Sequence, residues 1–166
     1  MVLLNHEAAF LFFQKELSLK GFKTLKVSQE CKGRHKVFYC EKGGQLVSFW
    51  VKFDKDWFHS FNYQFPAFIT QFPQYAGFGE SINVEYLEKA IRWNISFLVV
   101  INQYEDIYII TVKRLEEFVK EHKLYRFQDR TFNYKSKDFT SHKVAETEQT
   151  YSFPIKLLTN WKYIGE

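Results

Sequence analysis

A lysine and a carboxylate lie two residues apart at the end of the segment 45–54, which alternates between apolar and polar residues like a β-strand. Successive side chains of a strand point to opposite faces. Lys52 and Asp54 are therefore expected on one face, above a reverse face that contains Phe49 and Val51. A lysine and a carboxylate held together in this way form a place for chemistry. The alternative is that both residues simply lie where the strand emerges into water, as charged residues usually do.

A preceding strand and a tight turn are expected to position this pair. Residues 36–41 contain an apolar run, and Gly43 and Gly44 follow it, which is typical of a two-residue hairpin because both glycines tolerate positive φ. A turn centred between the glycines places His35 opposite Lys52. The polar face of the hairpin then contains His35, Tyr39, Glu41, Trp50, Lys52 and Asp54. A slip of one residue would change every member of this set.

The composition is that of a soluble globular chain forming one domain. The sequence has 166 residues, of which 46% are hydrophobic and 25% are charged. The aromatic fraction of 20% is high. Such an excess can fill a core, form a self-association surface or provide platforms on which bases stack. The net charge of +4 permits a polyanionic partner without requiring one.

The cysteine content and the hydropathy favour a cytoplasmic location. Cys31 and Cys40 are the only cysteines, so no second pair exists to form a zinc site. We expect free thiols in a reducing compartment. The apolar run at the N-terminus is too short for a signal peptide, and no run approaches the length of a membrane span, so no membrane partner is expected.

The periodic segments predict an α/β fold with a mixed central sheet flanked by helices. Residues 45–54 and the strongly apolar run 95–101 are expected to be its central strands, because a strand this apolar needs cover on both faces. Capping residues and helical spacing predict helices over 5–20 and 83–93. The whole chain, 1–166, is interpreted as a single domain, with a core over about 5–122 and a basic, aromatic C-terminal extension over 123–166.

The segment 57–78 is dense in aromatic residues and is interrupted by Pro66 and Pro73, so no regular element fits it cleanly. A loop with so many rings would expose a large apolar patch if it were solvated. One small domain has limited room for all of these rings. We therefore expect the segment to pack partly against a second copy of the chain, which predicts a homodimer.

Basic and aromatic residues alternate over 120–143. Lysine and arginine can bind phosphates with release of counterions, while rings between them can stack on bases. The alternative is a solvated pair of strands with a basic outer face. If the chain binds nucleic acid, the predicted contacts are Lys120, Lys123, Arg126, Arg130, Lys135, Lys137 and Lys143.

The order helix, three strands, helix, strand, with Lys52 near the end of the third strand, resembles the core of the PD-(D/E)XK nuclease superfamily. This superfamily includes restriction enzymes and archaeal Holliday-junction resolvases. The resemblance covers about residues 5–112 and includes the run from Val37 to Lys52. It implies a restriction endonuclease-like αβββαβ fold and a divalent ion, Mg²⁺ or Mn²⁺, that activates water at a phosphodiester bond.

The acidic motif of that superfamily is degenerate in this sequence. Lys52 matches the motif lysine, but Trp50 stands where the family has an acid, and Val37 or His35 occupies the second-strand position. Tryptophan does not bind magnesium. The resemblance therefore requires a displaced set of ligands. Asp54 is the expected substitute, together with a helix-1 glutamate, Glu7, and with His35 or Glu41.

Two functions follow from the resemblance. The first is a metal-dependent endonuclease, acting on DNA rather than RNA, in which Lys52 lies near the scissile phosphate and His35 assists. Its metal ligands would be Asp54, Glu7 and Glu41. The second is a catalytically inactive nuclease-like module that serves nucleic-acid binding or homo-oligomeric assembly, which Trp50 favours.

Overall fold

The computed structural model describes residues 2–55, 79–122, 125–135 and 141–164, which form an α/β fold. A mixed six-stranded sheet has the order β1-β2-β3-β5-β6-β9. A second sheet of three strands has the order β4-β8-β7. The helices and strands are α1 (His6–Leu19), β1 (Lys23–Glu30), β2 (His35–Lys42), β3 (Gln45–Phe53), β4 (Gly79–Asn83), α3 (Val84–Arg92), β5 (Phe97–Ile101), β6 (Ile107–Thr111), α4 (Val112–His122), β7 (Tyr125–Lys135), β8 (Ser141–Pro154) and β9 (Thr159–Asn160).

The first helix begins where its capping residue predicts. The Asn5 side-chain oxygen accepts a hydrogen bond from the Ala8 backbone N–H at 2.8 Å, which satisfies one of the free amides of the first turn. Phe10, Phe13 and Leu17 repeat at helical spacing and are buried against the sheet. The predicted helix over 5–20 is thus confirmed.

The hairpin of β2 and β3 has the register that the glycine turn predicts. His35 pairs with Lys52, and Val37 pairs with Trp50. Gly43 and Gly44 have φ values of +59° and +79°, a left-handed conformation that glycine adopts without steric cost. The two faces of the hairpin therefore contain the residues that the alternation assigned to them.

The predicted central strands lie side by side in one sheet. β3 pairs with β5 in parallel, and β5 pairs with β6 antiparallel. The chain crosses from β3 to β5 through α3, which the Asn83 side chain caps by accepting from the Glu85 N–H at 2.8 Å. The prediction of a mixed sheet whose central members are residues 45–54 and 95–101 is confirmed.

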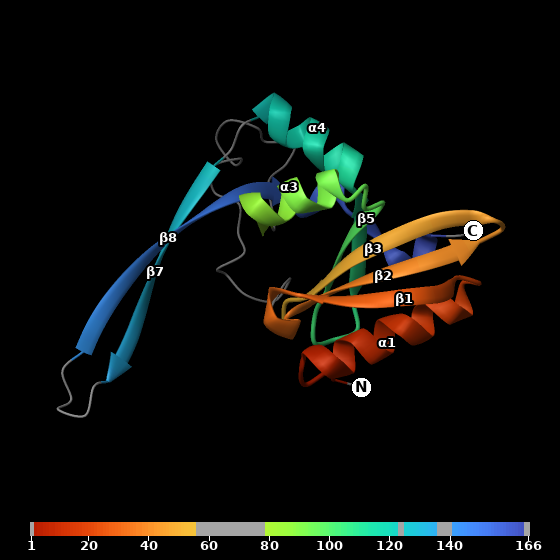
Figure 1. The fold of residues 1–166 in the computed structure, drawn as a ribbon, viewed down its shortest axis with the longest axis horizontal. Helices are drawn as coiled ribbons and strands as arrows, with labels where there is room; N and C mark the ends of the chain where they lie inside the picture. The colour runs from red at the N-terminus through yellow and green to blue at the C-terminus, as the bar shows by residue number, and fades with distance from the viewer. Residues whose placement is uncertain (1, 56–78, 123–124, 136–140, 165–166) are drawn as a thin grey trace.

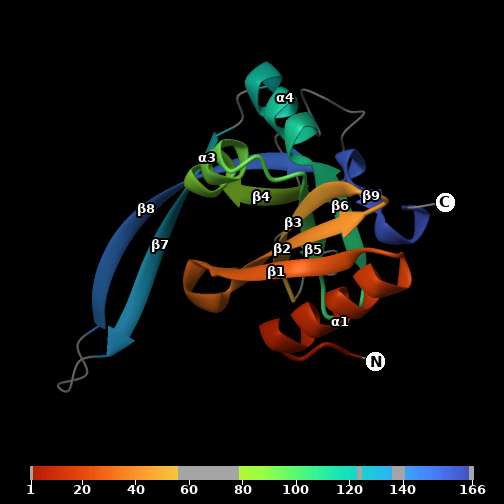
Figure 2. The ribbon, with the colours of Figure 1, turned by 45° about the vertical axis from the view of Figure 1, so that its right-hand side comes forward.

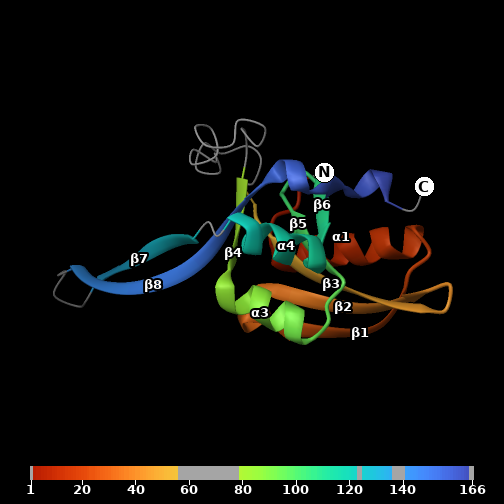
Figure 3. The same cartoon turned by 90° about the horizontal axis from the view of Figure 1, so that it is seen from above.

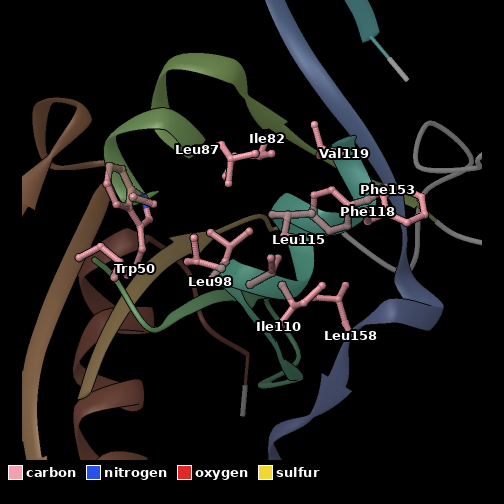
Figure 4. Packing of buried hydrophobic residues seen from close by; sticks show 14 of the residues in the cluster. Trp50, Ile82, Leu87, Leu98, Ile110, Leu115, Phe118, Val119, Phe153 and Leu158 are labelled. Atoms are coloured by element: carbon pink, nitrogen blue, oxygen red, sulfur yellow. The ribbon is translucent and has the colours of Figure 1, made fainter. Parts of the chain in front are cut away.

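Helices cover both faces of the six-stranded sheet. Figure 1 shows α1 on one side of the sheet and α3 and α4 on the other. Odd-numbered residues of β3, such as Phe49 and Val51, belong to the core under α1. Trp50, an even-numbered residue, belongs to the core under α3 and α4, and Figure 4 shows it at one side of that cluster. The face that contains the polar residues of β3 is thus a packed interface.

The C-terminal residues return to the main sheet. β9 pairs with β6, and Trp161 is buried against rings of α1 and β3. The Trp161 indole N–H donates to the Glu16 carboxylate at 3.3 Å. Part of the stretch assigned to a C-terminal extension, 123–166, therefore belongs to the core.

The three-stranded sheet continues into a long two-stranded ribbon. β8 pairs with β4 over residues 150–154, while β7 pairs with β8 over eleven register positions from Tyr125 to Lys135. Figures 2 and 3 show this ribbon projecting away from the rest of the described chain. The base of the ribbon is anchored by Phe153, which is buried under α4.

Two sequence predictions remain, one for the aromatic segment 57–78 and one for membrane spans. The aromatic segment 57–78, and with it the dimer contact predicted there, lies outside the described residues. Among the helices of the described ranges, none has the length and apolar character needed to cross a membrane.

Candidate functional site

The predicted catalytic residues lie at the end of the β2-β3 hairpin that is remote from the glycine turn. The register places His35 directly opposite Lys52. Asp54 follows the end of β3, and its backbone N–H donates to the Ile101 carbonyl at 2.8 Å. The parallel strand β5 therefore fixes the position at which the chain leaves the sheet. The structure brings Lys52, His35 and the backbone of Asp54 to one end of the sheet, as the sequence predicts.

His35 is bound to Trp50 by a side-chain hydrogen bond. The indole N–H of Trp50 lies 2.9 Å from His35 Nδ1. An indole nitrogen is only a donor, so Nδ1 must accept and a neutral imidazole must have its proton on Nε2. Trp50 is 1% exposed. Trp50 is thus a buried hydrogen-bond donor that fixes the tautomer of the neighbouring histidine.

The surroundings of His35 favour its neutral form. Burial, and then the positive charges of Lys52, His6 and Arg34, lower the pKa of His35 from 6.5 to about 3. Protonation would also place a second N–H against the Trp50 indole N–H and break their hydrogen bond. At neutral pH His35 is therefore an uncharged packing residue, which can accept at Nδ1 and donate at Nε2.

Three further residues, which the sequence did not indicate, complete this cluster. The Tyr86 and Trp93 rings both stack on Trp50, with ring centroids 6.1 Å and 5.9 Å away. The Cys31 sulfur lies 3.5 Å from His35 Nδ1. Burial raises the pKa of the Cys31 thiol, which a hydrogen bond with Tyr86 partly opposes. Tyr86 lies in α3, and Trp93 caps its C-terminal end. Their contact with β3 depends on how α3 packs across the sheet, which the local sequence does not indicate.

The predicted helix-1 ligand lies near the same end of the sheet. Glu7 is an exposed residue in the first turn of α1. Its neighbour His6 packs edge-to-face on the Phe53 ring, with centroids 5.5 Å apart. The start of α1 therefore adjoins the end of β3, which contains Lys52.

The third predicted ligand does not fit. Glu41 pairs with Leu46 beside the glycine turn. It lies six residues along β2 from His35, or about 20 Å at about 3.3 Å per residue. Glu41 therefore cannot share an ion with Asp54. Among the described ranges, no group of three His, Cys, Asp or Glu side chains is arranged to hold a metal ion, so the predicted magnesium ligands Asp54, Glu7 and Glu41 do not form a site there.

The predicted nucleic-acid contacts are spread over α4 and the ribbon. Lys120 forms an ion pair with Glu116 on the exposed side of α4, at 2.6 Å. Lys123 and Lys137 lie outside the described residues. Arg126, Arg130 and Lys135 belong to β7, for which the strand pairing defines the position of each residue.

The pairing of β7 with β8 divides the outer part of the ribbon into two faces. Paired residues of an antiparallel ribbon share a face, and successive pairs alternate. We call one set the basic face; its pairs are Thr131 with Ala145, Asn133 with Lys143, and Lys135 with Ser141. We call the other set the Phe132 face; its pairs are Arg130 with Glu146, Phe132 with Val144, and Tyr134 with His142.

Charge is distributed unevenly between these faces. The three pairs of the basic face contain Lys135 and Lys143, and the nearest acidic residue on the same side of the ribbon is Asp129, in the next pair toward the base. Arg130, a predicted contact, is instead paired with Glu146, and Arg126 shares its face with Glu148. Opposite charges at neighbouring cross-strand positions attract each other and reduce the local field. Of the predicted contacts within β7, Lys135 has the most favourable position for binding an anion.

Comparison of the chain with protein-family models, with curated proteins and with solved structures finds no match.

Proposed function

We propose that this chain binds nucleic acid through the basic face of its β7-β8 ribbon, on a nuclease-like core that does not cleave the phosphodiester backbone. The observation that motivates the proposal is the projecting ribbon with Lys135 and Lys143 on one face near its end. Lysine binds phosphate as a point charge, and polar neighbours such as Asn133 and Ser141 can donate to phosphate oxygens.

The nuclease-like part of the proposal is supported by the order of the elements. Helix α1, strands β1 to β3, helix α3 and strand β5 follow one another as the PD-(D/E)XK resemblance requires, apart from the added strand β4. Lys52 lies near the end of the third strand, and the start of α1 adjoins it. These features support a nuclease-like architecture.

The inactive part of the proposal is supported by the environment of Trp50. Its indole is buried, stacked on the Tyr86 and Trp93 rings, and hydrogen-bonded to His35. An acidic residue in this place would need a bound cation to offset the cost of burying its charge. Trp50 is uncharged, and its indole N–H needs only a hydrogen-bond acceptor. His35 Nδ1 provides that acceptor, so no ion is needed at this position.

Binding is tested by fluorescence anisotropy with labelled duplex DNA, single-stranded DNA and duplex RNA over a series of salt concentrations. We expect the double variant Lys135→Ala, Lys143→Ala to bind duplex DNA about tenfold more weakly and to lower the slope of log affinity against log salt by about 2. The matched control is Lys15→Ala, Lys23→Ala, which removes the same charge from exposed positions of α1 and β1. Equal weakening by both variants would contradict a contact at the ribbon.

Cleavage is tested on the same oligonucleotides and on branched DNA, with Mg²⁺ or Mn²⁺ present. We expect binding without cleavage. Cleavage that is abolished by Lys52→Ala or Asp54→Ala, with binding retained, would contradict the inactive assignment and support the endonuclease. Binding lost in the ribbon variant with no cleavage by the wild type would support both parts of the proposal.

A further inference from the structure

One end of the six-stranded sheet brings together three segments that are distant in the sequence. They are the end of α1, the turn between β2 and β3, and the C-terminal residues 161–164 (Figure 1). Lys42, beside the turn, adjoins the end of α1, since a Cβ on Gly21 would lie 3.7 Å from Lys42 Cε. The Lys20 ammonium donates to the Ile164 carbonyl at 2.6 Å. Residues 19–23, 42–46 and 161–164 therefore form one surface, which we call the turn end.

The turn end contains the two most exposed large apolar side chains of the described ranges. Leu19 and Leu46 are each 79% exposed, and Tyr163 is 60% exposed. Both leucines lie on regular elements, because Leu19 is the last residue of α1 and Leu46 is the second residue of β3. A single exposed leucine needs no explanation. Two that protrude at the same end can enter an apolar medium together.

Lysines surround these apolar side chains. Three of them lie over aromatic rings, with the ammonium 4.8 to 5.2 Å from the ring centre; the pairs are Lys20 with Trp161, Lys42 with Phe22, and Lys162 with Tyr163. A fourth, Lys23, pairs with Glu41 across the β1-β2 ladder, and Glu16 accepts from the Trp161 indole. Four lysines against two carboxylates leave the described part of this end positively charged.

The composition of the turn end fits a lipid surface better than a protein partner. The cores of protein interfaces are depleted in lysine, whereas lysines flank both exposed leucines here. Anionic lipid headgroups attract lysine, and a bilayer needs no matching shape. Figure 1 shows the β2-β3 turn as the outermost point on this side of the sheet, where it can reach a flat surface first.

We infer that the turn end binds the surface of an anionic lipid bilayer. Leu19 and Leu46 enter the boundary between headgroups and acyl chains, while the lysines remain at the level of the headgroups. Tyr163 supplies a ring with a polar tip, which suits the same boundary. Such a contact needs no membrane-spanning segment. It also does not depend on nucleic-acid binding, because the β7-β8 ribbon lies on the opposite side of the molecule (Figure 1).

Co-sedimentation of the full chain with lipid vesicles tests the apolar part of the contact. We expect binding to phosphatidylcholine vesicles that contain about 30% phosphatidylserine, and much weaker binding to pure phosphatidylcholine. The double variant Leu19→Ser, Leu46→Ser should bind the anionic vesicles at least about tenfold more weakly. The matched control is Leu4→Ser, Leu11→Ser, at exposed positions remote from the turn end. No binding by the wild type, or equal weakening by both double variants, would overturn the inference.

The charged part of the contact is tested on the same anionic vesicles. Lys42→Ala and Lys162→Ala should each weaken binding about fivefold. The matched controls are Lys113→Ala and Arg114→Ala, at exposed positions of α4, which should leave binding unchanged. Circular dichroism confirms that all variants are folded. Equal effects of the two sets, or displacement of the chain from vesicles by soluble glycerophosphoserine, would overturn the inference, because the second result would indicate a pocket for one headgroup.

Discussion

The two faces of the six-stranded sheet are packed by different means. Under α1 the core contains a cluster of aromatic rings among aliphatic side chains, in which the Phe13 ring centroid lies 5.2 to 5.7 Å from those of Phe38, Phe49 and Trp161. Under α3 and α4 the sheet also buries hydrogen-bonded polar groups, such as Trp50 with His35 and Ser48 with Ser96. The same strand, β3, supplies residues to both cores.

This difference follows from the polar residues of β3, which lie on one face of the sheet. The period of two in β3 places Ser48, Trp50 and Lys52 on the α3 and α4 face. The structure uses the first two as internally satisfied packing residues. The α1 face should therefore respond to lost volume, and the opposite face should respond to lost hydrogen bonds and to pH.

The largest effect is expected on the α1 face. Phe13→Ala removes a fully buried ring at the centre of the aromatic cluster and should lower the free energy of unfolding by about 3–5 kcal/mol. Leu11→Ala, on the same helix but 59% exposed, should change it by less than about 0.5 kcal/mol. Urea unfolding of both variants measures the difference. Similar losses would show that this face is not packed as described.

The next largest effect is expected at Trp50. Trp50→Phe keeps an aromatic ring but removes the donor to His35 Nδ1 and part of the buried volume, so it should cost about 2–3 kcal/mol. Trp93→Phe alters the ring that stacks on Trp50 and is 41% exposed, and it should cost less than about 1 kcal/mol. The order of the two midpoints in urea tests this, and a reversed order would place the main stacking contact at Trp93.

The pH dependence of stability should reveal His35. Its pKa in the folded protein is about 3, below the usual value of about 6.5 for an unfolded chain. The unfolded state therefore takes up a proton first as the pH falls. The contribution of His35 is complete above about pH 6.5 and declines as the pH is lowered toward 3, by up to about 2 kcal/mol between pH 6.5 and 5.

His35→Asn isolates this contribution, because asparagine retains an acceptor near the position of Nδ1 but does not titrate. The difference in unfolding free energy between the wild type and the variant should diminish as the pH falls from 7 to 5. A difference that is constant with pH would mean that His35 is protonated equally in both states.

The smallest effect is expected at the paired serines. The Ser48 hydroxyl accepts from the Ser96 backbone N–H, and the Ser96 hydroxyl accepts from the Ser48 N–H, both at 3.0 Å. Ser48→Ala leaves a partly buried amide without its partner and should cost about 1 kcal/mol. Ser18→Ala, at an exposed position of α1, should be neutral. Thermal unfolding of the two variants provides the comparison, and equal midpoints would remove the serine pair from the account.

Local patterns predicted much of the fold. The glycine turn fixed the register of β2 with β3, so the pairing of His35 with Lys52 followed from sequence spacing. Asn5 and Asn83 located the starts of two helices. These features depend on contacts between residues that are close in the chain, so a single sequence is enough to predict them.

The parts that the sequence did not predict depend on the crossing of distant segments. Tyr86 stacks on Trp50 because α3 lies across β3, and Trp161 enters the core because β9 adds to β6. The alternation of β2 places Glu41 on the same face as His35, but Glu41 lies six residues further along the strand, beside the glycine turn.

The central proposal is that the end of β3 which contains Lys52 holds a packed Trp50-His35 pair and that, among the described residues, Asp54, Glu7 and Glu41 do not together bind a divalent ion. Titration of ¹⁵N-labelled protein with Mn²⁺ tests this most directly, because the ion broadens the signals of nearby nuclei. We predict that His35 remains a neutral imidazole with its proton on Nε2 at pH 7. The Trp50 indole N–H and the backbone amides of Lys52 and Asp54 should broaden no more than amides of the β2-β3 turn. Selective broadening at Lys52, Asp54 and Glu7 would contradict the claim and would restore the metal-dependent nuclease.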